Sequence, residues 1–520
     1  MYPGAHVATD PHRAAVVMAA TGDRLTYAEL EERSVRLAHV LHDAGLRRGD
    51  VVALLTDNSI HAYEVYWAAV RSGLYITLVN SHLGASEVAY IVADSGAAAL
   101  VVSHALADLA QGLTAELADR TPAVRIRLAY GGPVAGYEDY EPALAAASPE
   151  PPADQPRGAD LLYSSGTTGR PKGIRPELPD RQVGEEGDVL VELTRAFYGF
   201  DRDTVYLSPA PVYHAAPLRY GASVHAVGGT VVMMERFDAE DALRAIERYR
   251  VTHSQWVPTM FIRMLRLPEK TRTAHDLSSH RVAVHAAAPC PPDVKRAMLD
   301  WWGPVLYEYY ASTEGIGTTF ITSEEWLSKP GSVGRSLLGE LRVCDDEGRP
   351  LPAGETGTIY FVREEGGFEY LGDAEKTKAA HHPDHPMWAT VGDLGYVDED
   401  GYLFLTDRKA FMIISGGVNI YPQEVEDVLA LHPDVVDVAV IGVPDAEMGE
   451  SVKAVVQASP DLRPGPDLER RLIDHVRSRI AHYKAPRSVD FVESLPRTPT
   501  GKLVKGKLKA RYASAPGGPS

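Results

Sequence analysis

Short apolar runs alternate with amphipathic segments over the first part of the chain. Residues 51–55 and 98–102 are continuous apolar runs rich in Val, Leu and Ala, as buried parallel strands tend to be. Residues 27–44 and 59–72 instead carry apolar side chains three or four positions apart, which predicts amphipathic helices. The alternation continues to residue 302 and predicts α/β layers built on a mostly parallel sheet.

The pattern changes after about residue 330, where glycine-rich turns separate short strand-like runs, as in antiparallel hairpins. A further α/β unit follows Arg408, with predicted helices at 423–431 and 467–480 and a last strand at 488–491. We therefore expect an α/β protein with two domains. The first is a large body of several subdomains over residues 1–407, with helices on parallel sheets and a small antiparallel β part. The second is a small, mobile α+β lid over residues 408–520.

The 520-residue chain has the composition of a globular protein, with 45% apolar and 24% charged residues. Its formal charge of −19, from 52 basic and 71 acidic residues, argues against binding to nucleic acid or to an anionic membrane. Its two cysteines, Cys290 and Cys344, form neither a disulfide framework nor a CxxC motif. We see no secretion signal and no membrane-spanning apolar run, and we expect a cytoplasmic enzyme that acts on small molecules.

The strongest chemical signal is the segment 163–173, which reads Tyr-Ser-Ser-Gly-Thr-Thr-Gly-Arg-Pro-Lys-Gly. Glycine lets backbone N–H groups approach an anion, hydroxyls donate further hydrogen bonds, and lysine adds a positive charge. The segment is typical of a phosphate-binding loop, although Pro171 stands where a Walker motif has glycine. The alternative is a polar loop that binds nothing. The candidate ligands are Ser164, Ser165, Gly166, Thr167, Thr168, Gly169 and Lys172.

This segment and five others resemble, in order along the chain, the motifs of the adenylate-forming superfamily. That superfamily includes acyl-CoA synthetases, adenylation domains and beetle luciferases. The other five motifs are PVYHAAP at 211–217, YYASTEG at 309–315, VGD at 391–393, DR at 407–408 with ISGG at 414–417, and PRTPTGK at 496–502. Because six matches stand in the superfamily order across nearly the whole chain, the resemblance is specific.

Members of this superfamily join a carboxylate to ATP, giving an acyl-adenylate and pyrophosphate, and then pass the acyl group to a thiol. Both reactants of the first step are anionic, so positive charge and fixed donors have to be supplied. The resemblance implies that Lys502 bridges the carboxylate and the α-phosphate, that Thr313 donates to that phosphate, and that Glu314 holds Mg²⁺. It also implies ribose contacts for Asp393 and Arg408, adenine contacts for Ala288, Pro289 and Tyr309, and neighbouring nucleotide contacts for Tyr310, Ala311 and Ser312.

Each of these charged residues has a structural alternative. Taken alone, Lys502 would be a solvated lysine of a basic tail and Glu314 an acid at a helix start. Asp393 would be a turn aspartate and Arg408 a surface arginine. The motif around each residue favours the functional interpretation.

The segment 211–217 resembles the part of the superfamily that lies beside the acyl pocket, with Tyr213 and His214 at its gate. His214 is a candidate catalytic residue, although a histidine flanked by alanines is more often structural. Small residues near these motifs leave space for a bulky or multi-ring apolar acid, or alternatively permit close helix packing. Those assigned to the pocket are Ala215, Ala286, Ala287 and Ala311, and Ala216, Gly221 and Ala222 are small as well.

For the second step, the resemblance implies that coenzyme A supplies the thiol. Ser415, Gly416 and Gly417 would let the pantetheine arm pass along bare backbone, and Tyr483 and Lys484 would lie near the CoA nucleotide. An enzyme that loads a carrier protein is the alternative, because adenylation domains share much of this pattern. A non-catalytic sensor of nucleotide or acyl ligand is a third interpretation, and the retained Lys172, Glu314, Asp393 and Lys502 argue against it.

The chain departs from the superfamily pattern at the nucleotide motifs and at the hinge. Ala410 stands at the hinge where Lys or Asp is usual, Val391 replaces the threonine of TGD, and Ala311 replaces the glycine of YGxTE. The segments assigned to CoA are intact. We hypothesise that thioester formation is the stronger half-reaction and that a separate adenylating enzyme supplies the adenylate. The chain is also similar to the diterpenoid acyl-CoA ligases of the platensimycin and platencin pathways, which implies a role in antibiotic biosynthesis.

Overall fold

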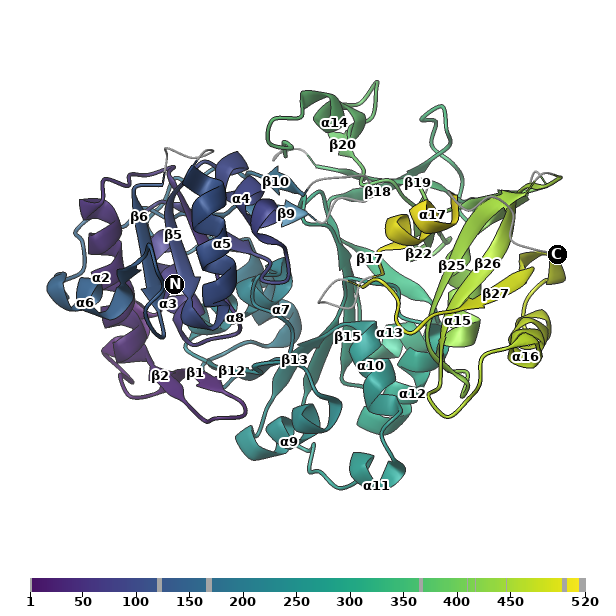
Figure 1. Cartoon of the computed structure of the whole chain (residues 1–520), viewed down its shortest axis with the longest axis horizontal. Helices are drawn as coiled ribbons and strands as arrows, with labels where there is room; N and C mark the ends of the chain where they lie inside the picture. Colours follow the sequence, from purple (N-terminus) through teal and green to yellow (C-terminus); the bar gives the residue numbers. More distant parts are fainter. Residues whose placement is uncertain are drawn as a thin grey trace. The chain divides into compact units, whose positions relative to one another are not determined.

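The computed structural model describes residues 2–118, 124–164, 171–363, 368–408, 410–416, 418–445, 447–497 and 503–513. The chain folds into two compact units, coloured along the sequence in Figure 1. Unit 1 comprises Met1–Gln255, Glu269–Ala283 and Phe368–Ala374, and unit 2 comprises Trp256–Pro268, Val284–Gly367 and Glu375–Ser520. Helices and strands alternate along the chain, so the predicted α/β class is confirmed.

A parallel sheet of six strands, in the order β7-β6-β5-β3-β4-β8, lies at the centre of unit 1. Strand β3 (Val51–Leu55) pairs in parallel with β4 (Tyr75–Val79) and β5 (Ala97–Ser103). Every residue of these three strands is buried, as the continuous apolar runs of the sequence predict for a sheet covered on both faces. The remaining strands are β6 (Ile126–Tyr130), β7 (Glu138–Asp139) and β8 (Ala159–Asp160).

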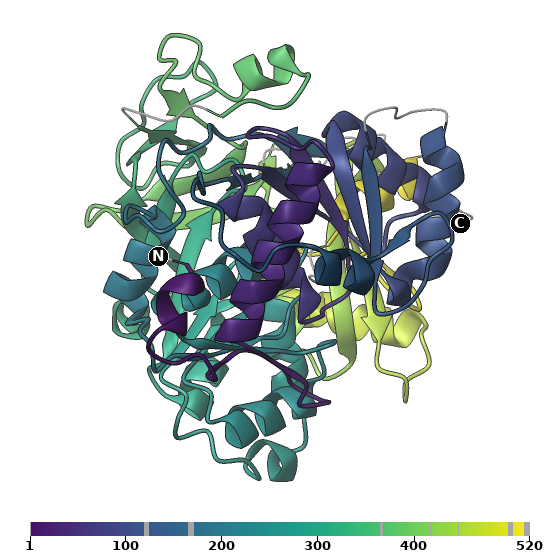
Figure 2. The same ribbon diagram turned by 90° about the vertical axis from the view of Figure 1, so that its left-hand side faces the viewer.

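Amphipathic helices cover this sheet. The side chains of Val51, Ala53 and Leu55 pack in one cluster with residues of α4 (Ala85–Asp94) and α5 (Ala107–Ala118). The predicted helices 27–44 and 59–72 are present as α2 (Tyr27–Asp43) and α3 (His61–Arg71), and α2 is the long purple helix of Figure 2. A capping box formed by Thr26 and Glu29 begins α2, because each side chain accepts a hydrogen bond from the other's backbone N–H.

A second group of paired strands in unit 1 flanks the predicted acyl segment in the sequence. Strand β11 (Val205–Ser208) lies between β12 (Thr230–Met233) and β13 (His253–Trp256), parallel to both. Strand β1 (Ala14–Met18) pairs in parallel with β12 and antiparallel with β2 (Arg24–Thr26). The helices that accompany these sheets are α1 (Gly4–Val7), α6 (Tyr140–Ala146), α7 (Val189–Tyr198), α8 (Ala215–Val227), α9 (Ala239–Tyr249) and α11 (Glu269–Arg272).

Antiparallel strands follow one another in unit 2, in the order β18-β19-β21-β22-β17-β16-β15. The predicted turn at 398–401 joins β21 (Asp393–Val397) to β22 (Leu403–Arg408), and the predicted antiparallel part is therefore confirmed. The other strands are β15 (Leu306–Ala311), β16 (Thr318–Ile321), β17 (Ser332–Leu338), β18 (Glu340–Cys344), β19 (Gly357–Val362) and β20 (Trp388–Ala389). Beside them lie β14 (Val282–His285) and helices α10 (Pro258–Leu265), α12 (Pro292–Trp302) and α13 (Ser323–Ser328).

The C-terminal part of unit 2 has its own mixed sheet, in the order β24-β23-β26-β25 with β27 beside β26. Side chains such as Ile413, Val425, Val440 and Leu472 form its buried core. The boundary predicted at 407/408 lies within unit 2 and stays a prediction. The elements are β23 (Ile413–Ser415), β24 (Val418–Ile420), α15 (Pro422–Ala430), β25 (Val435–Asp445), β26 (Gly449–Ala458), α16 (Pro466–Arg477), β27 (Ser488–Phe491) and α17 (Lys505–Ala513).

Among the helices that the structure describes, α2 is the longest, with 17 residues. Within the residues that the structure describes, no helix combines the length and the apolar character needed to cross a membrane.

Candidate active site

In unit 1, the phosphate segment is flanked by two short paired strands. Strand β9 (Leu162–Ser164) runs antiparallel to β10 (Lys172–Ile174), with the Cα of Lys172 opposite that of Ser164. Ser165, Gly166, Thr167, Thr168 and Gly169 lie outside the described residues, as does the side chain of Ser164. The pairing brings the two flanks of the segment together.

The amino group of Lys172 forms an ion pair with the carboxylate of Asp373. It also lies 5.8 Å from the centroid of the Tyr370 ring. Asp373 belongs to none of the predicted motifs, and it lies 201 positions from Lys172 in the sequence. The sequence alone therefore gave no sign of this ion pair. A phosphate group that binds the Lys172 ammonium would therefore have to compete with the Asp373 carboxylate for that positive charge.

The predicted acyl segment forms the turn between β11 and α8. The Tyr213 hydroxyl lies 3.2 Å from Nδ1 of His82, and the rings of Tyr213 and His214 are 4.5 Å apart between centroids. Burial raises the pKa of the Tyr213 phenol. His214 is the N-cap residue of α8, which begins at Ala215. The structure therefore holds all three predicted residues of this segment at one turn.

Asn58 fixes the conformation of this turn, and sequence reasoning missed it. Its side-chain amide donates to the carbonyl oxygen of Ala210 at 3.2 Å, and its side-chain oxygen accepts from the backbone N–H of Val212 at 2.8 Å. Asn58 is buried, so these bonds form away from solvent. The sequence carried no signal for this role, because Asn58 follows a strand on a different part of the chain.

Gly221 does not line open space. A Cβ at this position would lie 1.7 Å from the hydroxyl oxygen of Tyr63, which donates a hydrogen bond to the carbonyl oxygen of Pro217 at 3.1 Å. Glycine is needed here so that α8 can approach α3 closely. The small size of Gly221 therefore permits close helix packing, and it gives no support to a wide acyl pocket.

In unit 2, residues 286–289 follow directly after β14. Ala287 has a φ of +74°, a left-handed conformation that is uncommon for a residue with a Cβ. Backbone strain of this kind is found most often at ligand sites. Ala286 is buried, while Ala288 and Pro289 are more accessible.

Tyr310, Asp393 and the backbone of Arg408 come together in unit 2. The Tyr310 hydroxyl donates a hydrogen bond of 2.7 Å to the Asp393 carboxylate, which is 9% exposed. In the sheet, Asp393 and Arg408 are direct Cα partners of β21 and β22, and the side chain of Arg408 lies outside the description. Sheet pairing holds Asp393 beside Arg408, and the side-chain hydrogen bond joins Tyr310 to Asp393. These contacts bring the three positions predicted for the nucleotide together.

The turn after β15 carries Ser312, Thr313 and Glu314. The hydroxyl of Ser312 is buried and has no hydrogen-bond partner among the described residues. The backbone N–H of Gly315 donates to the carbonyl oxygen of Ser312 at 3.1 Å, and Arg363 donates to the carbonyl oxygen of Gly315 at 2.9 Å. No group of three or more His, Cys, Asp or Glu side chains that could hold a metal ion forms in the described part of the chain.

The residues predicted for the second step lie in the C-terminal part of unit 2. Gly416 has a φ of +57°, a left-handed conformation that favours glycine, and a Cβ there would lie 2.5 Å from the methyl group at the end of the flexible Met448 side chain. Tyr483 is 58% exposed, and Lys484 forms an ion pair with Glu424. Ser415 is buried, and Gly417 and Lys502 lie outside the description.

The predicted hinge residue Ala410 is exposed. Its carbonyl oxygen lies 3.5 Å from the amino group of Lys509 in α17, which donates to it. The methyl side chain of Ala410 offers no polar group, so the polar contact of this position comes from the backbone.

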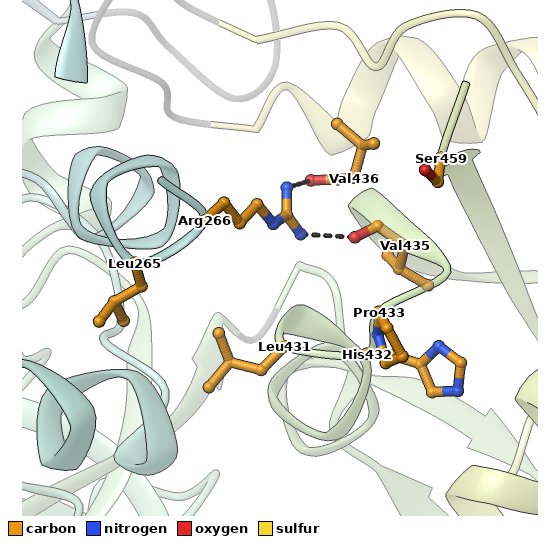
Figure 3. Close-up of a pocket in the computed structure, with 8 residues that line it drawn as sticks. All are labelled: Leu265, Arg266, Leu431, His432, Pro433, Val435, Val436 and Ser459. Carbon is orange, nitrogen blue, oxygen red and sulfur yellow. Dashed lines mark hydrogen bonds between the residues drawn. The ribbon is translucent and has the colours of Figure 1, made fainter. Parts of the chain in front are cut away.

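Figure 3 shows a pocket of unit 2 at the end of α10, where Arg266 donates to the backbone carbonyl oxygens of Val435 and Val436. The pocket is also lined by Leu265, Leu431, His432, Pro433 and Ser459. None of these residues belongs to a predicted motif, so this pocket is separate from the candidate site.

The chain belongs to the AMP-binding enzyme family. The family model matches residues 5–368, and the model of the AMP-binding enzyme C-terminal domain matches residues 424–502. The chain is therefore a member of the adenylate-forming superfamily and an AMP-forming acid–thiol ligase of the acyl-CoA synthetase type.

Similar proteins cover the whole length of the chain. A feruloyl-CoA synthase of Amycolatopsis is 37% identical over 98% of this chain and 98% of its own. The fatty acid–[acyl-carrier-protein] ligase ScoC of Streptomyces coeruleorubidus is 32% identical over 98% and 95%. The crystal structure of ATP-bound MatB from Rhodopseudomonas palustris superposes with a TM-score of 0.81 at 30% identity, over 99% of both chains.

Proposed function

We propose that the protein joins a bulky hydrophobic carboxylic acid to coenzyme A through an acyl-adenylate. The hydrogen bond between Tyr310 and Asp393 carries this proposal. It orients a nearly buried carboxylate between two motif segments, and a carboxylate in that position is suited to accept hydrogen bonds from both ribose hydroxyls.

The residues of unit 2 fit a nucleotide. The buried hydroxyl of Ser312 is available as a donor, because no described residue bonds to it. Ala287, in the segment assigned to adenine, combines a left-handed backbone with an exposed position. Glu314 would hold Mg²⁺ together with phosphate oxygens, where the ion neutralises charge on the triphosphate.

In the first step, a carboxylate oxygen attacks the α-phosphorus of ATP and pyrophosphate leaves. Lys502 would place its positive charge between the two anions, and the Thr313 hydroxyl would donate to the α-phosphate. Lys172 would serve the other phosphates after exchanging the carboxylate of Asp373 for a phosphate oxygen.

In the second step, the thiol of coenzyme A attacks the acyl carbonyl and AMP leaves. The resemblance assigns the pantetheine arm to the backbone of Gly416, where the Met448 methyl group now packs. Tyr483 offers an exposed aromatic face on which the CoA nucleotide can stack.

The relatives favour an aromatic acid as the first to test. The feruloyl-CoA synthase of Amycolatopsis makes ferulic acid the best first probe. Tyr213 and His214 would stand at the gate of the acyl pocket, with Ala215, Ala286, Ala287 and Ala311 around the acyl group. His214 would act on the acyl group or shape its entrance.

We further propose that residues 408–520 form a mobile lid with its hinge at Ala410. The separate match of the C-terminal family model at 424–502 supports this division. Since Ala410 lacks the polar side chain usual at the hinge, thioester formation would be the stronger half-reaction, fed by a separate adenylating enzyme. A cytoplasmic location and a role in antibiotic biosynthesis belong to the same proposal.

A carrier-protein thiol is the second candidate acceptor. One observation favours it: ScoC is a fatty acid–[acyl-carrier-protein] ligase. Both thiols are therefore offered as acceptors in the experiment.

The test uses the full-length protein with Mg²⁺ and either coenzyme A or a phosphopantetheinylated acyl-carrier protein. Ferulic acid, a long-chain fatty acid and a multi-ring diterpenoid acid are each offered once with ATP and once as the preformed adenylate. Mass spectrometry measures the thioester. The Lys502→Ala variant is the matched control, because it should lose the route from ATP and keep the route from the adenylate.

Thioester on CoA by both routes establishes an ordinary two-step ligase and removes the hinge hypothesis. Thioester on CoA from the adenylate alone supports a thioesterification enzyme. Thioester on the carrier protein alone makes the chain a carrier-loading enzyme. No thioester from any acid by either route contradicts the proposed function.

A further inference from the structure

A charged cluster that belongs to none of the motifs is buried in unit 2. The amino group of Lys295, in α12, lies 2.6 Å from the carboxylate of Glu308, in β15. Lys295 is fully buried and Glu308 is 4% exposed. The ammonium also lies 5.0 Å from the centroid of the Trp326 ring, so the charge is held between a carboxylate and an aromatic face.

His285, at the end of β14, completes the cluster. Its Nε2 lies 3.6 Å from the same Glu308 oxygen, which is too long for a hydrogen bond. Neither ring nitrogen has a hydrogen-bond partner within the described ranges, although the side chain is fully buried. Burial lowers the pKa of His285 and raises that of Glu308.

The cluster stands directly before both segments that resemble adenine-binding sequences. His285 is followed by residues 286–289, which include the left-handed Ala287. Glu308 is followed by Tyr309 and Tyr310, and the latter bonds to Asp393. A shift of α12 against β15 would therefore move the ends of both segments.

A buried ion pair is weak evidence for a contribution to stability. Removing two charges from water is unfavourable, and well-packed apolar residues in place of a buried ion pair often leave a protein equally or more stable. A buried histidine without hydrogen bonds adds a further unfavourable contribution. What the pair supplies, and apolar side chains cannot, is a directional bond that sets the distance between α12 and β15.

We infer that Lys295 and Glu308 are positioning residues for the nucleotide, holding residues 286–289 and 309–310 at the separation that the base requires. The inference rests on the proposed use of ATP, and it adds a role outside the motifs. The two side chains touch neither the base nor the phosphates in this proposal. They act through the ends of β14 and β15.

The experiment compares the full-length protein with the double variant Lys295→Met/Glu308→Leu. Both charges are removed together, because either single change leaves a buried charge without a partner and endangers folding. The affinity for AMP is measured by titration calorimetry, which requires no carboxylic acid. Thermal melting and the KM values for ATP and CoA are measured on the same samples.

The control is Arg71→Met/Glu31→Leu, which removes an ion pair of unit 1 between the buried Arg71 and the partly buried Glu31; this pair adjoins no predicted nucleotide segment. We expect the Lys295/Glu308 variant to melt at or above the wild-type temperature while its Kd for AMP rises about tenfold, as for the loss of one hydrogen bond to a charged group. Its KM for CoA should stay unchanged, and the control should keep the wild-type Kd for AMP.

A double variant with the wild-type Kd for AMP would overturn the inference, because the pair would then serve packing alone. A double variant that melts well below the wild type would overturn it too, since the pair would then serve stability. If the wild-type protein binds AMP but activates no acid, the proposed function is contradicted. The AMP affinities of the variants still test the positioning role, because their measurement requires no acid.

Discussion

The hydroxyl of Tyr310 donates a hydrogen bond to the carboxylate of Asp393, with 2.7 Å between the two oxygens. Tyr310 pairs in the sheet with Thr319 and Asp393 with Arg408, so the link between these strands is made by side chains. Because Asp393 is nearly buried, the bond limits the directions in which its second oxygen can point. The two motifs are 83 positions apart in the sequence, and this bond is where they meet.

Tyr310→Phe should raise the KM for ATP about tenfold, because Asp393 loses one hydrogen bond to a charged group. The KM for the carboxylic acid should not change, since the bond orients the Asp393 carboxylate, which in our proposal contacts the ribose and not the acid. Steady-state kinetics with ferulic acid measure both values. Tyr307→Phe, on the same strand, is the control, and an unchanged KM for ATP in Tyr310→Phe would contradict the assignment of Asp393.

Ala410→Lys should shift the balance of half-reactions toward adenylation by about fivefold, the size of a modest coupling between two conformations. A lysine adds a polar side chain at the proposed hinge, where the Ala410 carbonyl oxygen now accepts a hydrogen bond from Lys509. The measurement compares rates from free acid with ATP and from preformed adenylate. Ala353→Lys adds the same charge at an exposed loop of unit 2, and an equal shift there would remove the hinge from the explanation.

Gly221→Ala should lower the free energy of unfolding by about 1–3 kcal/mol, because the new methyl group overlaps the buried Tyr63 hydroxyl. The gain in helix propensity, about 1 kcal/mol at most, is too small to offset this overlap. Urea unfolding measures the difference. Gly112→Ala in α5 is the matched control, since its Cβ would lie 3.5 Å from that of Ala85, an ordinary contact. Equal stabilities of the two variants would show that Tyr63 moves aside.

Unit 1 should lose stability in mild acid. Burial lowers the pKa of His225 to about 3, and its ring nitrogens contact the indole N–H of Trp67 at 3.2 Å and the carbonyl oxygen of Ala15 at 3.1 Å. Below pH 6.5 the unfolded chain binds a proton that folded His225 rejects. The free energy of unfolding should therefore fall as pH drops, by up to about 1.4 kcal/mol per pH unit.

Urea unfolding between pH 7 and pH 5 tests this pH dependence. His225→Asn should be less stable at neutral pH but should show a shallower slope, because the group that titrates on unfolding is gone. His42→Asn changes an exposed histidine and should keep the wild-type slope. Identical slopes in all three proteins would show that His225 does not contribute, and His253, whose pKa burial lowers to about 4, would be the next candidate.

The sequence by itself determined the elements and the family. The apolar runs of β3 and β5 predicted buried strands because parallel strands are covered on both faces, and the periodicity of α2 predicted a helix to within one residue of its end. Residues 488–491 were predicted as a strand with the bounds of β27. The patterns of helices and strands depend on residues that are close together in the sequence, so they can be recognised without the tertiary structure.

Only the tertiary structure decided which distant side chains meet. Lys172 pairs with Asp373, Asn58 fixes the turn before His214, and Tyr63 occupies the space beside Gly221. The ion pair of Lys295 and Glu308 and the left-handed backbone of Ala287 likewise have no local signature. The physical reason is that hydrophobic periodicity specifies which face of an element is buried, whereas the partner of each buried polar group is set by how whole elements pack.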